Sequence, residues 1–219
     1  MIPLRLLRLL SFRTTTVEFA ELNRSDLYLG LVLSWIVGIG RYWDDPGATI
    51  FQHLGLGSVI YVFALSALLW AILLPFKVSD WRYERVLTFV ALTSAPAIFY
   101  AIPVERFFSM ELSARINAYF LLIVATWRVA LLFFFLRQSV RLSGIEAFIG
   151  TFLPITFIVS TLTVLNLERA VFEIMGGIRA PTSRDFAYQI LLLITIVSAV
   201  MFLPLLVGYV TCLLRRRRN

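Results

Sequence analysis

Arg128 is the strongest candidate for a functional residue in this sequence, because it lies inside a long apolar run. The run extends from about Ile116 to Leu136 and contains no carboxylate. A charged side chain at the centre of a membrane span is costly and usually faces the protein interior or water. Two interpretations are open. Arg128 contacts an anion, a lipid headgroup or a substrate, or it snorkels or forms hydrogen bonds between helices.

The next apolar run offers polar neighbours for this arginine. If the two helices are antiparallel, Thr151 and Thr156 bracket the depth of Arg128, and Pro154 between them frees a backbone carbonyl. Asn166, at the end of the same run, can hydrogen-bond across helices or cap its own helix. We therefore predict Arg128, Thr156 and Asn166 as the intramembrane polar residues that would contact a ligand.

Enzymatic motifs are missing from the sequence. His53 is the only histidine and Cys212 the only cysteine, which argues against zinc, haem and copper sites. Neither a phosphate-binding loop nor a nucleophile elbow is present. No acidic residue lies deep in an apolar run, which argues against a carboxylate-based ion relay. These absences predict a non-catalytic protein without a cofactor or metal.

Composition defines the class of protein. The 219 residues are 60% hydrophobic and only 15% charged, with a net charge of +7, and the mean hydropathy is +0.87. Soluble domains carry about 25% charged residues, so soluble enzymes and disordered proteins are excluded as default interpretations. Nucleic-acid binding is disfavoured because the arginines lie between apolar runs and at the termini, as membrane orientation requires. We predict an integral membrane protein.

The apolar runs predict an all-α bundle of transmembrane helices. They are apolar on every face, which excludes the alternating pattern of a β-barrel. The first run is close to the minimum length for spanning, so we expect about six spans, or five if this run is re-entrant. Kinks are predicted at Pro96, Pro154 and Pro204. The expected spans lie near residues 27–43, 54–76, 86–102, 116–136, 147–167 and 186–214.

Both ends of the chain are basic. Residues 1–24 include a short basic helix with Arg5 and Arg8, which we expect to lie on a membrane surface. Residues 215–219 form a basic tail after the transmembrane region, residues 25–214. We expect the arginines at both ends to contact anionic headgroups or a protein partner. Those of the tail are Arg215, Arg216, Arg217 and Arg218.

The distribution of Lys and Arg predicts the orientation. With six spans, thirteen of these residues fall on the side that holds both termini and six on the other side. The positive-inside rule then places both termini in the cytoplasm. The short loops, the arginine bias and the lack of a signal peptide favour a bacterial inner membrane.

Small residues recur every four positions in the first run, at Gly30, Ser34 and Gly38. Such a stripe lets another helix approach closely. The partner helix belongs either to the same chain or to a second copy, and we favour packing within the chain.

Part of the chain resembles a known family. The stretch from Arg85 to about Pro154 contains Leu92-Thr93-Ser94-Ala95-Pro96 within a helix, Asn117 opening the next helix, and Arg137 closing it. Ser143-Gly144-Ile145-Glu146-Ala147 then opens a further helix. These features resemble the YIP family of small multi-spanning membrane proteins. The resemblance implies a non-enzymatic helical bundle, and the chain departs from the family in its six expected spans and its short N-terminal region.

Two functions follow as hypotheses. The first is a non-catalytic membrane-embedded subunit or scaffold that assembles with protein partners or with itself. The alternative is a subunit of a transporter or channel for an anionic or lipidic solute that Arg128 contacts.

Overall fold

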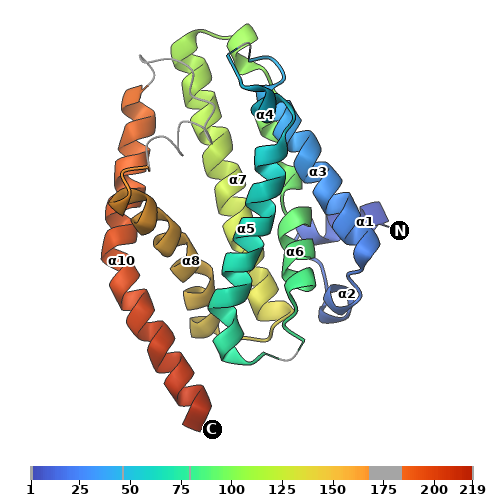
Figure 1. The fold of residues 1–219 in the computed structure, drawn as a ribbon, viewed down its shortest axis with the longest axis vertical. Helices are drawn as coiled ribbons and strands as arrows, with labels where there is room; N and C mark the ends of the chain where they lie inside the picture. Colours follow the sequence, from blue (N-terminus) through green and yellow to red (C-terminus); the bar gives the residue numbers. More distant parts are fainter. Residues whose placement is uncertain (1, 46, 79, 168–183, 219) are drawn as a thin grey trace.

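The structure, a computed structural model, describes residues 2–45, 47–78, 80–167 and 184–218 (Figure 1). The described part of the chain is helical and has no strand. Its elements are α1 (Ile2–Leu10), α2 (Thr16–Ala20), α3 (Arg24–Tyr42), α4 (Ile50–His53), α5 (Leu56–Leu73), η1 (Leu74–Phe76), α6 (Tyr83–Leu92), η2 (Ala95–Ala101), η3 (Val104–Arg106), α7 (Met110–Gln138), α8 (Gly144–Val164) and α10 (Arg184–Arg218).

Five helical segments of the described residues are long and apolar enough to cross a membrane, which confirms the prediction of an all-α transmembrane bundle. Each coincides with a run expected from the sequence, because a backbone in hydrocarbon must satisfy its hydrogen bonds within its own helix. The protein is an integral membrane protein. The segments are Leu56–Phe76, Tyr83–Arg106, Glu111–Gln138, Gly144–Val164 and Ile190–Arg218.

The first apolar run forms α3, a continuous helix of 19 residues that is not among these five segments. It carries Asp26 in its first turn and Arg41 in its last, and Asn23 and Asp26 form a capping box at its start. Figure 1 shows α3 running alongside α5 in the opposite direction. The run is therefore an unbroken helix rather than a re-entrant loop.

Five segments meet at one end of the bundle, the lower end in Figure 1. Arg24 at the start of α3 pairs with Glu84 of α6. Arg85 donates to Ser139 Oγ in the loop after α7, at 2.8 Å. Arg216 near the end of α10 pairs with Glu146 at the start of α8. We call this end the basic end, because Arg24, Arg85 and Arg216 lie there.

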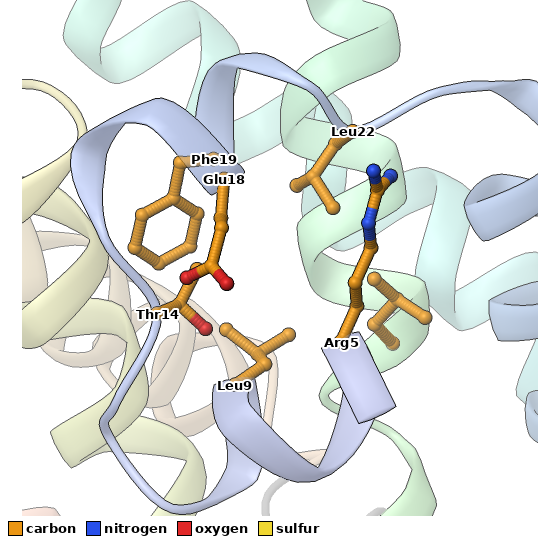
Figure 2. Close-up of a pocket in the computed structure, with 7 residues that line it drawn as sticks. Arg5, Leu9, Thr14, Glu18, Phe19 and Leu22 are labelled. Carbon is orange, nitrogen blue, oxygen red and sulfur yellow. The ribbon is translucent and has the colours of Figure 1, made fainter. Parts of the chain in front are cut away.

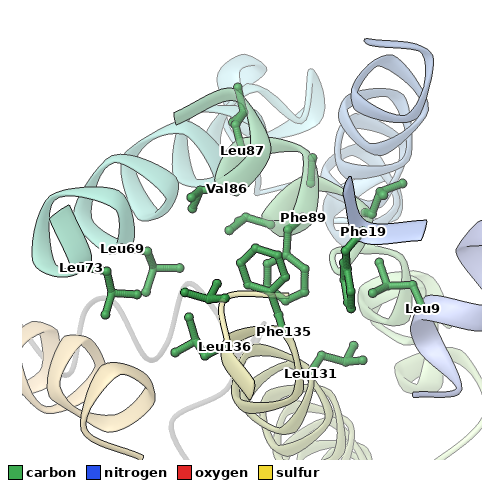
Figure 3. Close-up of a cluster of buried hydrophobic side chains, with 14 of the residues drawn as sticks. Leu9, Phe19, Leu69, Leu73, Val86, Leu87, Phe89, Leu131, Phe135 and Leu136 are labelled. Atoms are coloured by element: carbon green, nitrogen blue, oxygen red, sulfur yellow. The ribbon is translucent and has the colours of Figure 1, made fainter. Parts of the chain in front are cut away.

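The largest apolar core lies in the half of the bundle nearer the basic end (Figure 3). At its centre the rings of Phe89 on α6 and Phe135 on α7 stack with centroids 4.2 Å apart. Phe19 of α2 packs on Phe135 at 5.3 Å. Leu73 and Leu136 are fully buried beside them. The short helix α2 is thereby fixed to the transmembrane bundle.

The small-residue stripe of α3 packs within the chain. A Cβ at Gly30 would lie 2.8 Å from the backbone of Ala91, and one at Gly38 would lie 2.6 Å from Gly55 O. The Ser34 hydroxyl, which is buried, donates to Gly30 O at 2.8 Å and to Ala91 O at 3.4 Å. The stripe therefore holds α3 against α6 and against the start of α5.

The three prolines differ in their effect. Pro154 and Pro204 lie inside α8 and α10, which continue past them. Pro96 does not kink a continuous α-helix. Instead α6 ends at Leu92, and Pro96 lies in the first turn of the 3-10 helix η2. The reason is that Pro96 has no N–H with which to continue the α-helical pattern.

The ends of the chain differ from the expected division. The N-terminal region contains two helices, α1 and α2, rather than one. The arginines after Leu214 are not a separate tail, because α10 continues as a helix to Arg218. The terminal cations therefore have fixed directions relative to the bundle.

Candidate functional site

Arg128 reaches toward the end of the bundle opposite the basic end. Its guanidinium carbon lies 5.8 Å from the centre of the Tyr61 ring on α5. Side chains on a helix lean toward its N-terminus, and the N-terminus of α7 lies at the opposite end from Arg24, Ser139 and Arg216. Arg128 thus lies in the half of α7 nearer the basic end, and its half-buried side chain points toward the opposite end.

A second arginine interacts electrostatically with Arg128. Arg41, in the last turn of α3, places its guanidinium carbon 4.5 Å from the centre of the Tyr100 ring. Close packing of α3 on η2 makes this contact possible. A Cβ on Gly40 would lie 2.7 Å from the Ala101 Cβ, and Trp43 Nε1 donates to Ala101 O at 3.0 Å.

The resulting site draws one side chain from each of four elements, namely Arg41 of α3, Tyr61 of α5, Tyr100 of η2 and Arg128 of α7. We call it the arginine pair site. Tyr100 packs against a small buried apolar cluster formed by Val37, Ala97 and Val124. Tyr61 is 41% exposed, so the site is open on the side of α5.

The electrostatics of the site are unbalanced. The two guanidinium groups lie within electrostatic range of each other, and both act on the Tyr100 hydroxyl. Neither forms an ion pair with a carboxylate of the described residues. Stacking on an aromatic face leaves the N–H edge of a guanidinium able to donate, and Arg41 also interacts with the neighbouring Tyr42 side chain. The site thus offers several donors and two positive charges.

The polar residues predicted to accompany Arg128 have other roles. The Thr156 hydroxyl donates to Phe152 O and Leu153 O of its own helix, both at 3.1 Å. Asn166 lies just past the end of α8 with a φ of 55°, the left-handed conformation that ends a helix. The Thr151 hydroxyl is buried without a partner among the described residues. No described contact joins these three residues to Arg128.

The arginines near the N-terminus, expected to contact headgroups, have partners within the chain. Arg5 pairs with Glu21 at 3.2 Å and with Asp26 at 3.4 Å. Arg8 pairs with Glu18. The carboxylate of Glu18 also accepts from the Thr15 backbone N–H, and this hydrogen bond together with Arg8 lowers the pKa of Glu18.

The arginines of the last turn of α10 fall into two groups. Arg216 forms two bonds to the Glu146 carboxylate, at 2.6 and 3.1 Å, and donates to Phe76 O at 2.9 Å. Arg215, Arg217 and Arg218 are exposed and form no ion pair within the described residues. Arg216 therefore joins α10 to α8 and η1, while the other three remain available to headgroups or a partner.

The sequence contains one signal for the second arginine of the site. Arg41 follows Gly38 by three residues and so continues the face of α3 that carries the small-residue stripe. A charge on a face that packs against other helices is unusual. Neither Tyr61 nor Tyr100 has such a signal in the sequence.

Comparison with known protein families, with characterised proteins and with solved structures finds no match for this chain. The resemblance to the YIP family therefore stays a prediction. The function must be argued from the arginine pair site itself.

Proposed function

We propose that this integral membrane protein is non-catalytic and binds an anionic group, a phosphate or a carboxylate, at the arginine pair site. The single observation that carries the proposal is that Arg41 and Arg128, each stacked on a tyrosine ring, interact with each other electrostatically and form no ion pair with a carboxylate of the described residues. Two like charges in a medium of low dielectric repel each other. An anion between them would replace that repulsion by two attractions.

The residue types suit such a ligand. Guanidinium groups bind phosphate and carboxylate oxygens in pairs and remain charged when partly buried. The tyrosine hydroxyls supply further donors, and the exposed edge of Tyr61 gives the ligand a route from the surface of the bundle. The ligand is then the headgroup of an anionic lipid or a dissolved organic anion. A protein of this kind would serve as the binding subunit of a transporter or channel.

The test is a ligand panel on the purified protein in a neutral detergent. The melting temperature is measured with inorganic phosphate, a short-chain phosphatidic acid and a short-chain fatty acid. We expect at least one anion to raise it, because a ligand that binds only the folded state stabilises that state. Phosphate alone would indicate a dissolved anion, whereas a response that requires the acyl chains would indicate a lipid.

Substitutions assign the effect to the site. Arg41→Gln and Arg128→Gln are each expected to weaken binding of the active anion about tenfold to a hundredfold, the equivalent of one charged hydrogen-bonding group. The control is Arg115→Gln, which removes an exposed arginine that pairs with Glu111. Unchanged binding in both site variants, or an equal loss in the control, would contradict the proposal.

A second candidate function is assembly with partner proteins. It is favoured by α10, whose most apolar stretch is only 17% buried within the chain and which ends in exposed arginines. Lipid tails or a partner helix can cover such a surface. The test is the native mass of the protein released from lipid nanodiscs. A stoichiometric partner or homo-oligomer would support a subunit or scaffold, and a lipid-bound monomer would contradict it.

We further propose that the basic end faces the cytoplasm, as the positive-inside rule requires, and that the membrane is a bacterial inner membrane. The start of α3, the segment after η1, the loop after α7 and the end of α10 lie at the same end, and these segments carry Arg24, Lys77, Arg141 and Arg217, which supports this orientation. Reporter fusions after Arg218 test it. Activity of a cytoplasm-dependent reporter is expected, and activity of a periplasm-dependent reporter would reverse the assignment.

A further inference from the structure

The N-terminal helices α1 and α2 contact the rest of the chain through buried apolar side chains, Leu9 and Phe19, and through ion pairs. Arg5 and Arg8 point at carboxylates of α2 and α3, as the ion pairs with Asp26 and Glu18 show. Figure 2 shows Arg5 and Glu18 on the walls of a cavity of about 10 Å³, the size of a single water site. The Thr14 hydroxyl on the same wall is buried without a described partner.

The outward side of the same helices is apolar. It carries Leu4, Leu7, Phe12 and Val17, whose exposed fractions are 55%, 63%, 42% and 64%. A helix facing water would place its arginines outward and its leucines inward. Arg8, which is exposed, and Leu9, which is buried, follow this pattern, but Leu4 and Leu7 are exposed as well, so the outward side is suited to hydrocarbon.

This apolar surface continues the surface of a membrane span. Trp127 of α7 donates from Nε1 to Leu10 O at 3.0 Å, and the rings of Phe12 and Phe134 meet at 5.8 Å. The exposed residues Leu122 and Ile123 lie one turn further along α7. Lipid chains that cover α7 therefore reach the outward side of α1 without a gap.

Unpaired cations border this surface toward the basic end. Thr16 Oγ1 donates to Gln138 O at 3.0 Å, which holds the segment after α1 against the end of α7. Arg13 precedes this contact, and Arg137 and Arg141 lie beside it in the chain. All three are exposed, and none forms an ion pair within the described residues. Arg137 donates to Leu142 O at 2.7 Å, so it also stabilises the loop between α7 and α8.

We propose that the outward side of α1 and α2, with Arg13, Arg137 and Arg141, is a docking surface for anionic phospholipid. The acyl chains cover Leu4, Leu7, Phe12 and Val17, and the arginines bind the headgroup phosphates. Arg5 and Arg8 do not take part, because carboxylates of the chain already neutralise them. This surface is separate from the arginine pair site and does not depend on the function proposed for that site.

The first experiment measures what covers Leu7. A bimane label is attached to Leu7→Cys in a Cys212→Ser background, and the protein is placed in nanodiscs with doxyl-labelled lipids. Quenching by the lipid label and protection from iodide are expected. The control is Arg217→Cys, which iodide should quench. Quenching of the Leu7 label by iodide, or protection from both quenchers by a second copy of the chain, would overturn the proposal.

The second experiment measures headgroup preference. The association of spin-labelled phosphatidylglycerol is compared with that of spin-labelled phosphatidylcholine by electron paramagnetic resonance. Each arginine near an anionic surface contributes a factor of about five, so Arg13→Gln with Arg141→Gln is expected to lower the preference by about threefold to tenfold. Arg115→Gln at the opposite end is the control. An unchanged preference in the double variant, or an equal fall in the control, would refute the arginine contacts.

Discussion

At the basic end, Arg5, Arg8 and Arg216 each face a carboxylate of the same chain, whereas Arg41 and Arg128 face tyrosine rings. The two groups use the same residue type in the same membrane protein. The difference is whether the described residues supply the counter-charge. Where they do, the arginine joins segments of the fold. Where they do not, we propose that the arginine binds an anion from outside.

If the paired arginines are structural, removing their counter-charges should have the largest effect. Asp26 is 1% exposed and accepts hydrogen bonds from Arg5 and from the Asn23 backbone N–H. Asp26→Ala is expected to lower the free energy of unfolding by about 2–4 kcal/mol, because it removes the buried one of the two carboxylates that pair with Arg5 and leaves the Asn23 N–H without its acceptor. Reversible unfolding in detergent micelles measures this change.

The control for this prediction is Glu111→Ala, which breaks an exposed pair one helical turn apart at the opposite end. Its expected cost is about 0.5 kcal/mol or less. Equal costs for the two substitutions would show that the carboxylate of Asp26 has no special structural role.

The link between α8 and α10 gives a smaller expected effect. Glu146→Gln and Arg216→Gln are each expected to lower the free energy of unfolding by about 1–3 kcal/mol. The pair is partly exposed, but Arg216 also donates to Phe76 O. The double variant should cost less than the sum of the two, because each substitution removes the same contact. Arg217→Gln is the control and should be nearly neutral. Additive costs would argue against a direct pair.

The same comparison separates the parts of the structure that could be predicted from the sequence from those that could not. The transmembrane helices and the charge of each end could be predicted, because both follow from where apolar residues and arginines lie along the chain. Arg128 was predictable as an isolated charge. Its partners were not, since the meeting of Arg41 and Arg128 depends on how α3 packs on η2 and α7. The pairing of Arg5 with Asp26 was missed because it requires α1 to fold back on α3.

An unpaired arginine should respond in the opposite way when no anion is present. Arg128→Gln in anion-poor buffer is expected to change the free energy of unfolding by less than about 1 kcal/mol, or to increase it. The reason is that the substitution removes an unfavourable charge from a membrane span. The measurement is the same unfolding experiment in neutral detergent. A loss as large as that of Asp26→Ala would place Arg128 among the structural arginines.

The smallest expected effect is a dependence on pH at α2. The pKa of Glu18 is lowered from its ordinary value of 4.5, chiefly by the Thr15 backbone N–H and then by Arg8. A carboxylate with a lowered pKa contributes stability above its unfolded pKa and loses it as the pH falls through the folded pKa. Melting temperatures from pH 6 down to about pH 3 should fall less steeply in Glu18→Gln than in the unsubstituted protein. Identical slopes would contradict the prediction.

The most direct test of the arginine pair site is a double-mutant cycle on Arg41 and Arg128, measured without and with a saturating anion from the panel. The free energies of unfolding of the parent, Arg41→Gln, Arg128→Gln and the double variant give the coupling between the two residues. We predict an unfavourable coupling of the two charges without the anion, which becomes favourable when the anion is bound. A coupling that keeps its sign and size in both conditions would contradict the proposal that the two arginines bind an anion together.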